Sequence, residues 1–178
     1  ETLVSSTAAD AGSPSVAADA LGYAHAVWVE TLPIDGGTRS QLVAARQDPL
    51  ADGWSDASVV FVVDSGEVSR PKVVTDSYNN AVAAWIWSAG GGRRIAASRY
   101  RVASGAWSNA VVIAPGDSGV SPEEFDVGAG GIDGGGSEAN LDRWRMQFTT
   151  AEGQPLAGSA LVRQSFDVGG LNVHFIDV

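Results

Sequence analysis

One stretch of the sequence gathers aromatic and basic side chains around a single glycine-rich loop. Residues 81–100 read AVAAWIWSAGGGRRIAASRY, with Trp87 before the loop and Arg93, Arg94 and Tyr100 after it. Sugars stack on aromatic rings and hydrogen-bond to guanidinium groups, and a site of that kind needs few polar groups. We therefore take these four side chains as candidate ligand-binding residues. The alternative is structural, with the tryptophan packed and the two arginines forming a solvated tip.

A second stretch offers oxygen ligands for a metal ion. Residues 131–142 read GIDGGGSEANLD, which supplies Asp133, Glu138 and Asp142. Carboxylates are the ligands that calcium prefers, although the spacing does not fit an EF-hand. Calcium is therefore the one candidate cofactor, and the alternative is an acidic loop that binds no metal.

No arrangement typical of a catalytic centre is found in the sequence. Glu123, Glu124 and Asp126 cluster within four residues, but adjacent residues of a strand point to opposite faces, so we do not take them as a pair of facing carboxylates. The two histidines are His25 and His174, and no Gly-x-Ser-x-Gly motif is present. Because His25 lies in the middle of an apolar run, we expect it to pack between sheets. We assign no catalytic residue, and the sequence favours a protein that is not an enzyme.

Composition excludes several classes of partner and supporting chemistry. The 178 residues carry a net charge of −10, so nucleic acids and anionic membrane surfaces are poor partners. The chain has no cysteine, and no apolar run approaches the length of about 20 residues that a membrane-spanning helix needs. Its first residues lack the pattern of a signal peptide, so we expect any export signal either to have been removed already or never to have been part of this sequence.

The chain repeats itself, which bears directly on its fold. In the first part of the repeat the matching residues are 57 positions apart, as in Pro14 and Pro71, Asp19 and Asp76, and Trp28 and Trp85. In the second part, Arg46 matches Arg99, and each is followed eight residues later by a tryptophan, Trp54 or Trp107. Gly22 matches Asn79, two residues that tolerate a left-handed turn.

A third copy is more divergent. Pro122 opens it, Trp144 takes the place of the first tryptophan, and Arg163 takes the place of the arginine, with Leu171 eight residues later. The glycine-rich insertion 128–140 separates its first segments. We expect Trp28, Trp85 and Trp144 to be buried, and the recurrent arginines to form hydrogen bonds or ion pairs between copies.

Each copy is predicted to form four short antiparallel strands. In the second copy these are 71–76, 80–87, 94–101 and 107–113, which are rich in Val, Ile, Trp and Ala and are separated by Gly, Asn, Asp and Ser. Four strands in a repeat of about 50 residues are typical of a β-propeller blade. The predicted fold is all-β, with three four-stranded blades at 13–61, 69–113 and 120–178. Residues 1–12 are expected to be the outer strand of a preceding blade and its link.

The recurring pattern Pro-x-Val, Asp, A-x-x-W, I-x-x-x-R-Y and G-x-W resembles the blades of bacterial secreted repeat propellers. It is more distantly similar to fucose-binding lectin propellers, whose blades carry an aromatic-Arg-aromatic rhythm. The Ser-x-Asp-x-Gly-x-x-Trp box of sialidases and the Gly-His and Trp-Asp pairs of WD repeats are missing. The resemblance implies an extracellular or periplasmic protein with a lectin-like, carbohydrate-binding or scaffolding role.

Three blades cannot close a ring, because propellers have about 4–8 blades. We therefore expect either a homo-oligomer or the neighbouring blades of a longer chain. The expected function is a non-catalytic extracellular binding or scaffold module whose partner is a glycan or a protein. Two alternatives stay open. One is part of a larger propeller hydrolase or lyase with catalytic residues outside this chain, and the other is a structural subunit of a surface assembly.

Overall fold

The computed structural model describes residues 9–114, 125, 127, 162–168 and 171–177, which form an all-β structure of antiparallel sheets. The first sheet has four strands in chain order: β1 (Asp10–Ala18), β2 (Ala24–Ile34), β3 (Gly37–Gln47) and β4 (Ser58–Val63). The second sheet has five strands: β5 (Glu67–Thr75), β6 (Ala81–Ala89), β7 (Gly92–Arg101), β8 (Ala106–Trp107) and β9 (Val111–Ala114). A separate hairpin pairs β10 (Val162–Val168) with β11 (Leu171–Asp177).

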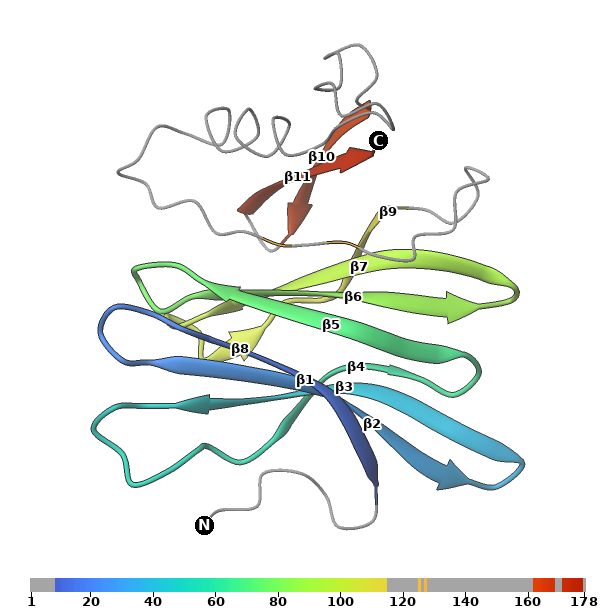
Figure 1. Ribbon diagram of the computed structural model, residues 1–178, viewed down its shortest axis with the longest axis horizontal. Coiled ribbons are helices and arrows are strands. Elements are labelled where there is room, and N and C mark those ends of the chain that lie inside the picture. Colours follow the sequence, from blue (N-terminus) through green and yellow to red (C-terminus); the bar gives the residue numbers. More distant parts are fainter. Residues whose placement is uncertain (1–8, 115–124, 126, 128–161, 169–170, 178) are drawn as a thin grey trace, which may run out of the picture.

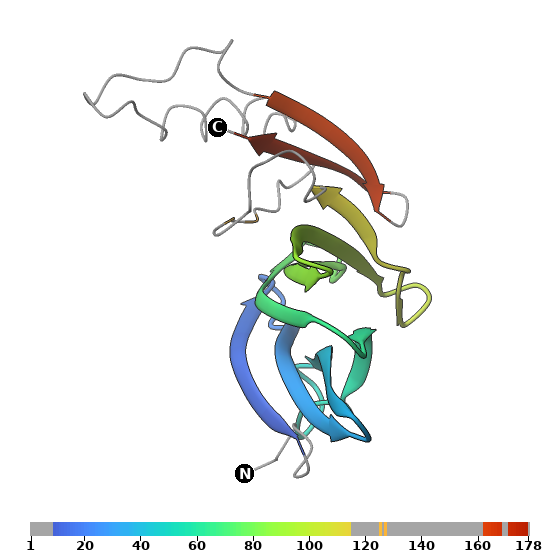
Figure 2. The same cartoon turned by 90° about the vertical axis from the view of Figure 1, so that its right-hand side faces the viewer.

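The two sheets are stacked, and the hairpin lies beyond the second one (Figure 1). The view turned by 90° shows the same order along the molecule (Figure 2). The sheets span 10–63 and 67–114, slightly more than the segments 13–61 and 69–113 expected from the repeat. Residues 10–12, expected to belong to a link, pair with β2 in the first sheet.

The repeat is confirmed by backbone conformation in the first half of each sheet. Ser13 and Arg70 both have positive φ, 53° and 49°, and each lies within a register shift between the first two strands of its sheet. Gly22 and Asn79 also match, with φ of 87° and 63°. These are the two residues that we expected to adopt a left-handed turn, which glycine and asparagine tolerate best.

An aspartate organises each of these turns in the same way. The Asp19 carboxylate accepts hydrogen bonds from the backbone N–H groups of Leu21 and Tyr23, at 2.9 and 3.0 Å. The Asp76 carboxylate accepts from Tyr78 and Asn80, both at 2.9 Å. Because the aspartate side chain takes the place of a backbone acceptor, the turn is held together by residues that are close in sequence. This explains why the repeat keeps an aspartate here.

The second half of each sheet repeats a pair of hydrogen bonds between an arginine and a serine, which we call the arginine device. The backbone N–H of Arg46 donates to the Ser55 hydroxyl at 3.0 Å, and that of Arg99 donates to the Ser108 hydroxyl at 3.1 Å. The N–H groups of the two serines donate back to the arginine carbonyls at 2.7 and 2.8 Å. This device interrupts the strand expected at 107–113, which is divided into β8 and β9.

An apolar core fills the space between the two sheets. The first sheet contributes Val27, Leu42 and Ala44, which are at most 2% exposed, and the second contributes chiefly Ala83, Trp85 and Ala96. Two serine hydroxyls of the first sheet add polar links, because they accept from backbone N–H groups of β5 (Ser40 from Val68, at 3.0 Å, and Ser15 from Val73, at 3.2 Å).

The expected burial of the repeated tryptophans is confirmed where the structure describes them. Trp28 and Trp85 are each the fifth residue of the second strand of their sheet, and they are 6% and 0% exposed. Trp85 faces the first sheet, whereas Trp28 lies on the opposite face of that sheet, in a cluster with Val43 and Ala45. Trp144 and Pro122 lie outside the described residues.

The hairpin covers the other face of the second sheet. Val168 of β10 is fully buried against Ala84, Ile95 and Ile113. The hairpin does not reproduce the arginine device of the first two copies, because Arg163 stands near the start of β10 and pairs with Ile176. In the first two copies the arginine stands near the end of the third strand, and a longer connection follows it. Two glycines alone separate β10 from β11 in the sequence, which leaves no room for that connection.

Candidate functional site

The structure brings Trp87 and Arg94 together. They are directly paired on β6 and β7, and the guanidinium carbon of Arg94 lies 5.2 Å from the centre of the Trp87 ring. A cation at this distance over an indole face is attracted by the ring electrons. Trp87 also meets Phe61 of the first sheet edge-on, with ring centres 5.3 Å apart. The indole is thus packed between the sheets, and its Nε1 atom is buried without a hydrogen bond.

The other two expected ligand residues do not join this pair. Arg93 is exposed and lies opposite Ser88, so it points to the other face of the sheet from Arg94. Tyr100 pairs with Ala81 near the far end of β7, six residues from Arg94. At about 3.3 Å per residue, that separation is roughly 20 Å. The four residues flank one loop in sequence, but the strand carries the tyrosine away from it.

Tyr100 belongs instead to a partly buried cluster between the two sheets. Its ring lies 4.8 Å from that of His25 and 5.7 Å from that of Trp107, measured between ring centres. His25 is 1% exposed, and one of its ring nitrogens, Nε2, lies 3.2 Å from Asn79 Oδ1. The expectation that His25 packs between sheets is therefore confirmed.

Arg46 of the first sheet contacts the same cluster. Its guanidinium carbon lies 4.8 Å from the centre of the Tyr23 ring, and its Nε approaches Asn79 Oδ1 at 3.5 Å. For Arg46, the contact between copies that we expected of the recurrent arginines is confirmed. The cluster also shows why Asn79 replaces the glycine of the first copy, since its amide oxygen faces both His25 and Arg46.

The cluster lowers the pKa of His25. Burial is the main cause, because it disfavours the charged imidazolium, and the Arg46 charge acts in the same direction. The hydrogen bond with Asn79 opposes these effects but does not outweigh them. His25 is therefore neutral at pH 7, and its enclosure by Tyr100 and Trp107 leaves it no access to a substrate.

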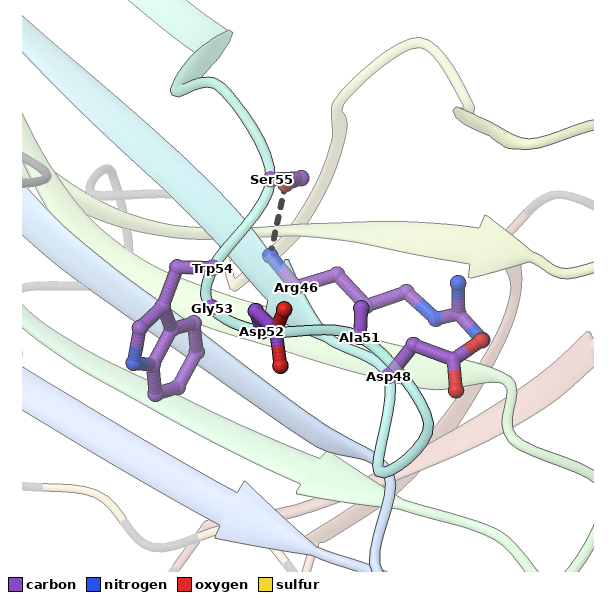
Figure 3. Close-up of a pocket in the computed structure, with 7 residues that line it drawn as sticks. All are labelled: Arg46, Asp48, Ala51, Asp52, Gly53, Trp54 and Ser55. Carbon is purple, nitrogen blue, oxygen red and sulfur yellow. Dashed lines mark hydrogen bonds between the residues drawn. The ribbon is translucent and has the colours of Figure 1, made fainter. Parts of the chain in front are cut away.

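A surface hollow of about 400 Å³ opens beside this cluster, at the turn between β3 and β4. Sequence reasoning did not find it. Its lining consists of Arg46, Asp48, Ala51, Asp52, Gly53, Trp54 and Ser55. Figure 3 shows the Arg46 guanidinium and the Asp48 carboxylate pointing the same way, the Asp52 carboxylate in the middle of the turn, and the Trp54 indole on its other side. The turn is preorganised, because Asp48 accepts from the Leu50 N–H at 2.9 Å.

The two carboxylates of the hollow are specific to the first copy. With the arginines aligned, Asp48 corresponds to Arg101 and Asp52 to Gly105. Two carboxylates thus stand where the matching turn of the second sheet has a cation and no side chain. That contrast is the signal in the sequence that could have found the hollow.

A second groove, of about 420 Å³, lies between the sheets at their outer strands. One wall is formed by Val59, Val60, Phe61 and Val62 of β4, and the other by Trp107, Ser108, Asn109 and Ala110. Val59 and Val62 are 55% and 47% exposed, which leaves an apolar strand in contact with solvent.

The expected metal ligands Asp133, Glu138 and Asp142 lie outside the described residues, as do Glu123, Glu124 and Asp126. Within the described part of the chain, no three histidine, cysteine or acidic side chains gather in a way that could hold a metal ion. In that same part, no helix has the length and apolar character needed to cross a membrane. Comparison with protein-family models, curated proteins and solved structures gives no significant match.

Proposed function

We propose that the two sheets are consecutive blades of a β-propeller and that residues 120–178 contribute a third. The observation that carries this proposal is the repetition of one hydrogen-bonded frame in two sheets that stack face to face. The Asp19 and Asp76 turns, the Arg46 and Arg99 devices and the two tryptophans each occur at matching positions. Blades of this kind would be completed by a second copy of the chain or by further blades of a longer protein.

The blades would serve as a non-catalytic extracellular or periplasmic binding module. The burial of His25 favours this over a catalytic role. His25, a natural candidate for acid–base chemistry, is enclosed and holds a structural position. A larger hydrolase or lyase, with its catalytic residues outside this chain, is the alternative, and the sequence of the complete gene would decide between them.

The ligand of the module would be a glycan or another polyhydroxylated compound, bound at the hollow. Carboxylates and a guanidinium group together offer acceptors and donors for several hydroxyl groups, and the Trp54 indole borders the same turn. The first copy alone among the two described turns carries the two carboxylates, so the repeated architecture does not require them. A departure from a repeat at a surface turn is where a binding function is expected.

A glycan array tests this function, followed by titration of the strongest binder with variants. We expect the double variant Asp48→Asn, Asp52→Asn to weaken binding at least tenfold. The double variant Asp35→Asn, Asp56→Asn is the matched control, because it removes the same two charges from exposed residues outside the hollow. Loss of binding in Arg94→Gln, with the double variant unaffected, would move the site to the Trp87–Arg94 pair. No specific glycan for the wild-type chain would overturn glycan binding and favour a scaffold.

A further inference from the structure

The outer edge of the first sheet is a strand without charge. β4 reads Ser-Val-Val-Phe-Val-Val, and β3 is the one strand that pairs with it among the residues the structure describes. An edge strand presents unpaired N–H and C=O groups, and natural proteins protect such edges with charges, proline or a cover. β4 contains none of the protective residues, although the chain as a whole is strongly acidic.

A β-bulge places the two exposed valines on one face. The pairing of β4 with β3 shifts at Val60, so that Val59 lies opposite Val43 and Val62 lies opposite Gln41. Val43 and Gln41 are two residues apart on β3 and therefore share a face. Without the bulge, Val59 and Val62, three residues apart, would point to opposite faces of the sheet.

The corresponding segment of the second sheet is covered. With the arginines aligned, Val60 of β4 matches Ile113 of β9, and Ile113 is 5% exposed because Val168 of the hairpin packs against it. The same position in the repeat is thus buried in the second copy but only half-buried in the first, where it lines the groove. The bulge belongs to the repeat, because the pairing of β9 with β7 shifts at Ile113 in the same way, whereas Val59 is exposed and its counterpart Val112 is half-buried.

We propose that β4 pairs edge to edge with β4 of a second copy of this chain. The strand is self-complementary in the antiparallel direction. With the twofold axis between Val60 and Phe61, Val59 lies opposite the partner's Val62, and Ser58 opposite the partner's Val63. The axis is perpendicular to the sheet, so the exposed valines of both copies form one apolar row. Two four-stranded sheets become one eight-stranded sheet.

The charges at the ends of β4 are compatible with this pairing. One end carries the exposed ion pair between Arg39 and Asp64, and the other carries Asp56. In the antiparallel register Asp64 lies opposite the partner's Ala57, so acidic residues of the two copies are not directly opposed. The net charge of −10 per copy opposes association, and added salt should therefore strengthen it. A six-residue strand makes a small interface, so we expect a weak dimer.

Sedimentation of the full chain over a series of micromolar concentrations tests the proposal. We expect the mass to rise toward that of two chains, and to rise further with salt. Val62→Lys should abolish this rise. Val16→Lys should retain it, because Val16 is 65% exposed on β1, the opposite edge of the same sheet. A monomer at every concentration, or association that survives Val62→Lys, would overturn the proposal. Association that survives Val62→Lys would still be compatible with blades that stack through their faces.

Cross-linking tests the register, since the chain has no cysteine of its own. A mixture of Val59→Cys and Val62→Cys chains should form a disulfide-linked dimer at least tenfold faster than either variant alone. Cross-linking of each variant with itself at an equal rate would contradict the antiparallel register.

Discussion

The two sheets share a backbone frame, but the repeated tryptophan has polar neighbours in the first sheet and apolar neighbours in the second. In the first sheet Trp28 Nε1 donates to Glu30 at 3.0 Å, and Glu30 also accepts from Gln41 at 3.0 Å. In the second sheet the residues that match Glu30 and Gln41 are Trp87 and Arg94. Trp85 Nε1, which matches the Trp28 donor, is buried with no hydrogen-bond partner.

This difference follows from what lies opposite the second tryptophan. Trp85 faces the first sheet, where Phe61 approaches its ring at 5.2 Å between centres. Aromatic rings fill that space with apolar surface. Arg94, the counterpart of Gln41, places its charged guanidinium group over the Trp87 ring. The turns therefore set the frame of each copy, and the neighbouring surface selects the side chains within it.

The largest effect is expected from removing the tryptophan at the centre of the contact. Trp85→Ala should reduce the free energy of unfolding by about 3–5 kcal/mol, because it leaves a large cavity between the sheets. Chemical denaturation measures this change. A loss comparable to that of an exposed substitution such as Val16→Ala would show that the two sheets do not pack through Trp85.

The hydrogen bond of the first copy should appear as a difference between two matched substitutions. Trp28→Phe leaves the buried Glu30 with one donor fewer, whereas Trp85→Phe removes an N–H that has no partner. We expect Trp28→Phe to cost about 0.5–1.5 kcal/mol more than Trp85→Phe, the range for the loss of one intramolecular hydrogen bond. Equal costs in denaturation experiments would contradict the contrast between the copies.

A smaller effect is expected from pH, through His25. Because its pKa is lowered in the folded state, the unfolded chain binds the proton first as the pH falls below about 6.5. The free energy of unfolding should therefore decrease from pH 7 toward pH 5. His25→Val, which introduces the residue found at the matching position of the second copy, should flatten this dependence. An unchanged slope in the variant would exclude His25 as its source.

Much of the frame could be predicted from the sequence, because it depends on local chemistry. Asp19, Gly22 and their counterparts mark turns that close within five residues, and the spacing of the tryptophans predicts the strand that buries them. The position of Tyr100 in the fold could not be predicted in this way. Its distance from the loop depends on the full length of β7, and its partner His25 comes from the other sheet.

The repeat pattern marks where the hollow and the exposed edge differ between the copies, but it does not by itself locate either of them. Both lie where the first copy differs from the second, at Asp48 and Asp52 and along β4. An alignment of the copies shows which residues differ, but not which of those differences face solvent. The bulge at Val60 adds a further change of face that no two-residue periodicity predicts.

A double-mutant cycle between Phe61 and Trp85 tests the central claim, that the sheets stack through this face. The cycle combines Phe61→Leu with Trp85→Leu, and a matched cycle combines Phe61→Leu with Trp28→Leu. We predict a coupling energy of about 0.5–1.5 kcal/mol for the first cycle, the range for an aromatic pair in contact. The second cycle should be additive, because Trp28 lies on the opposite face of the first sheet. An additive first cycle, or stronger coupling with Trp28, would contradict the stacking.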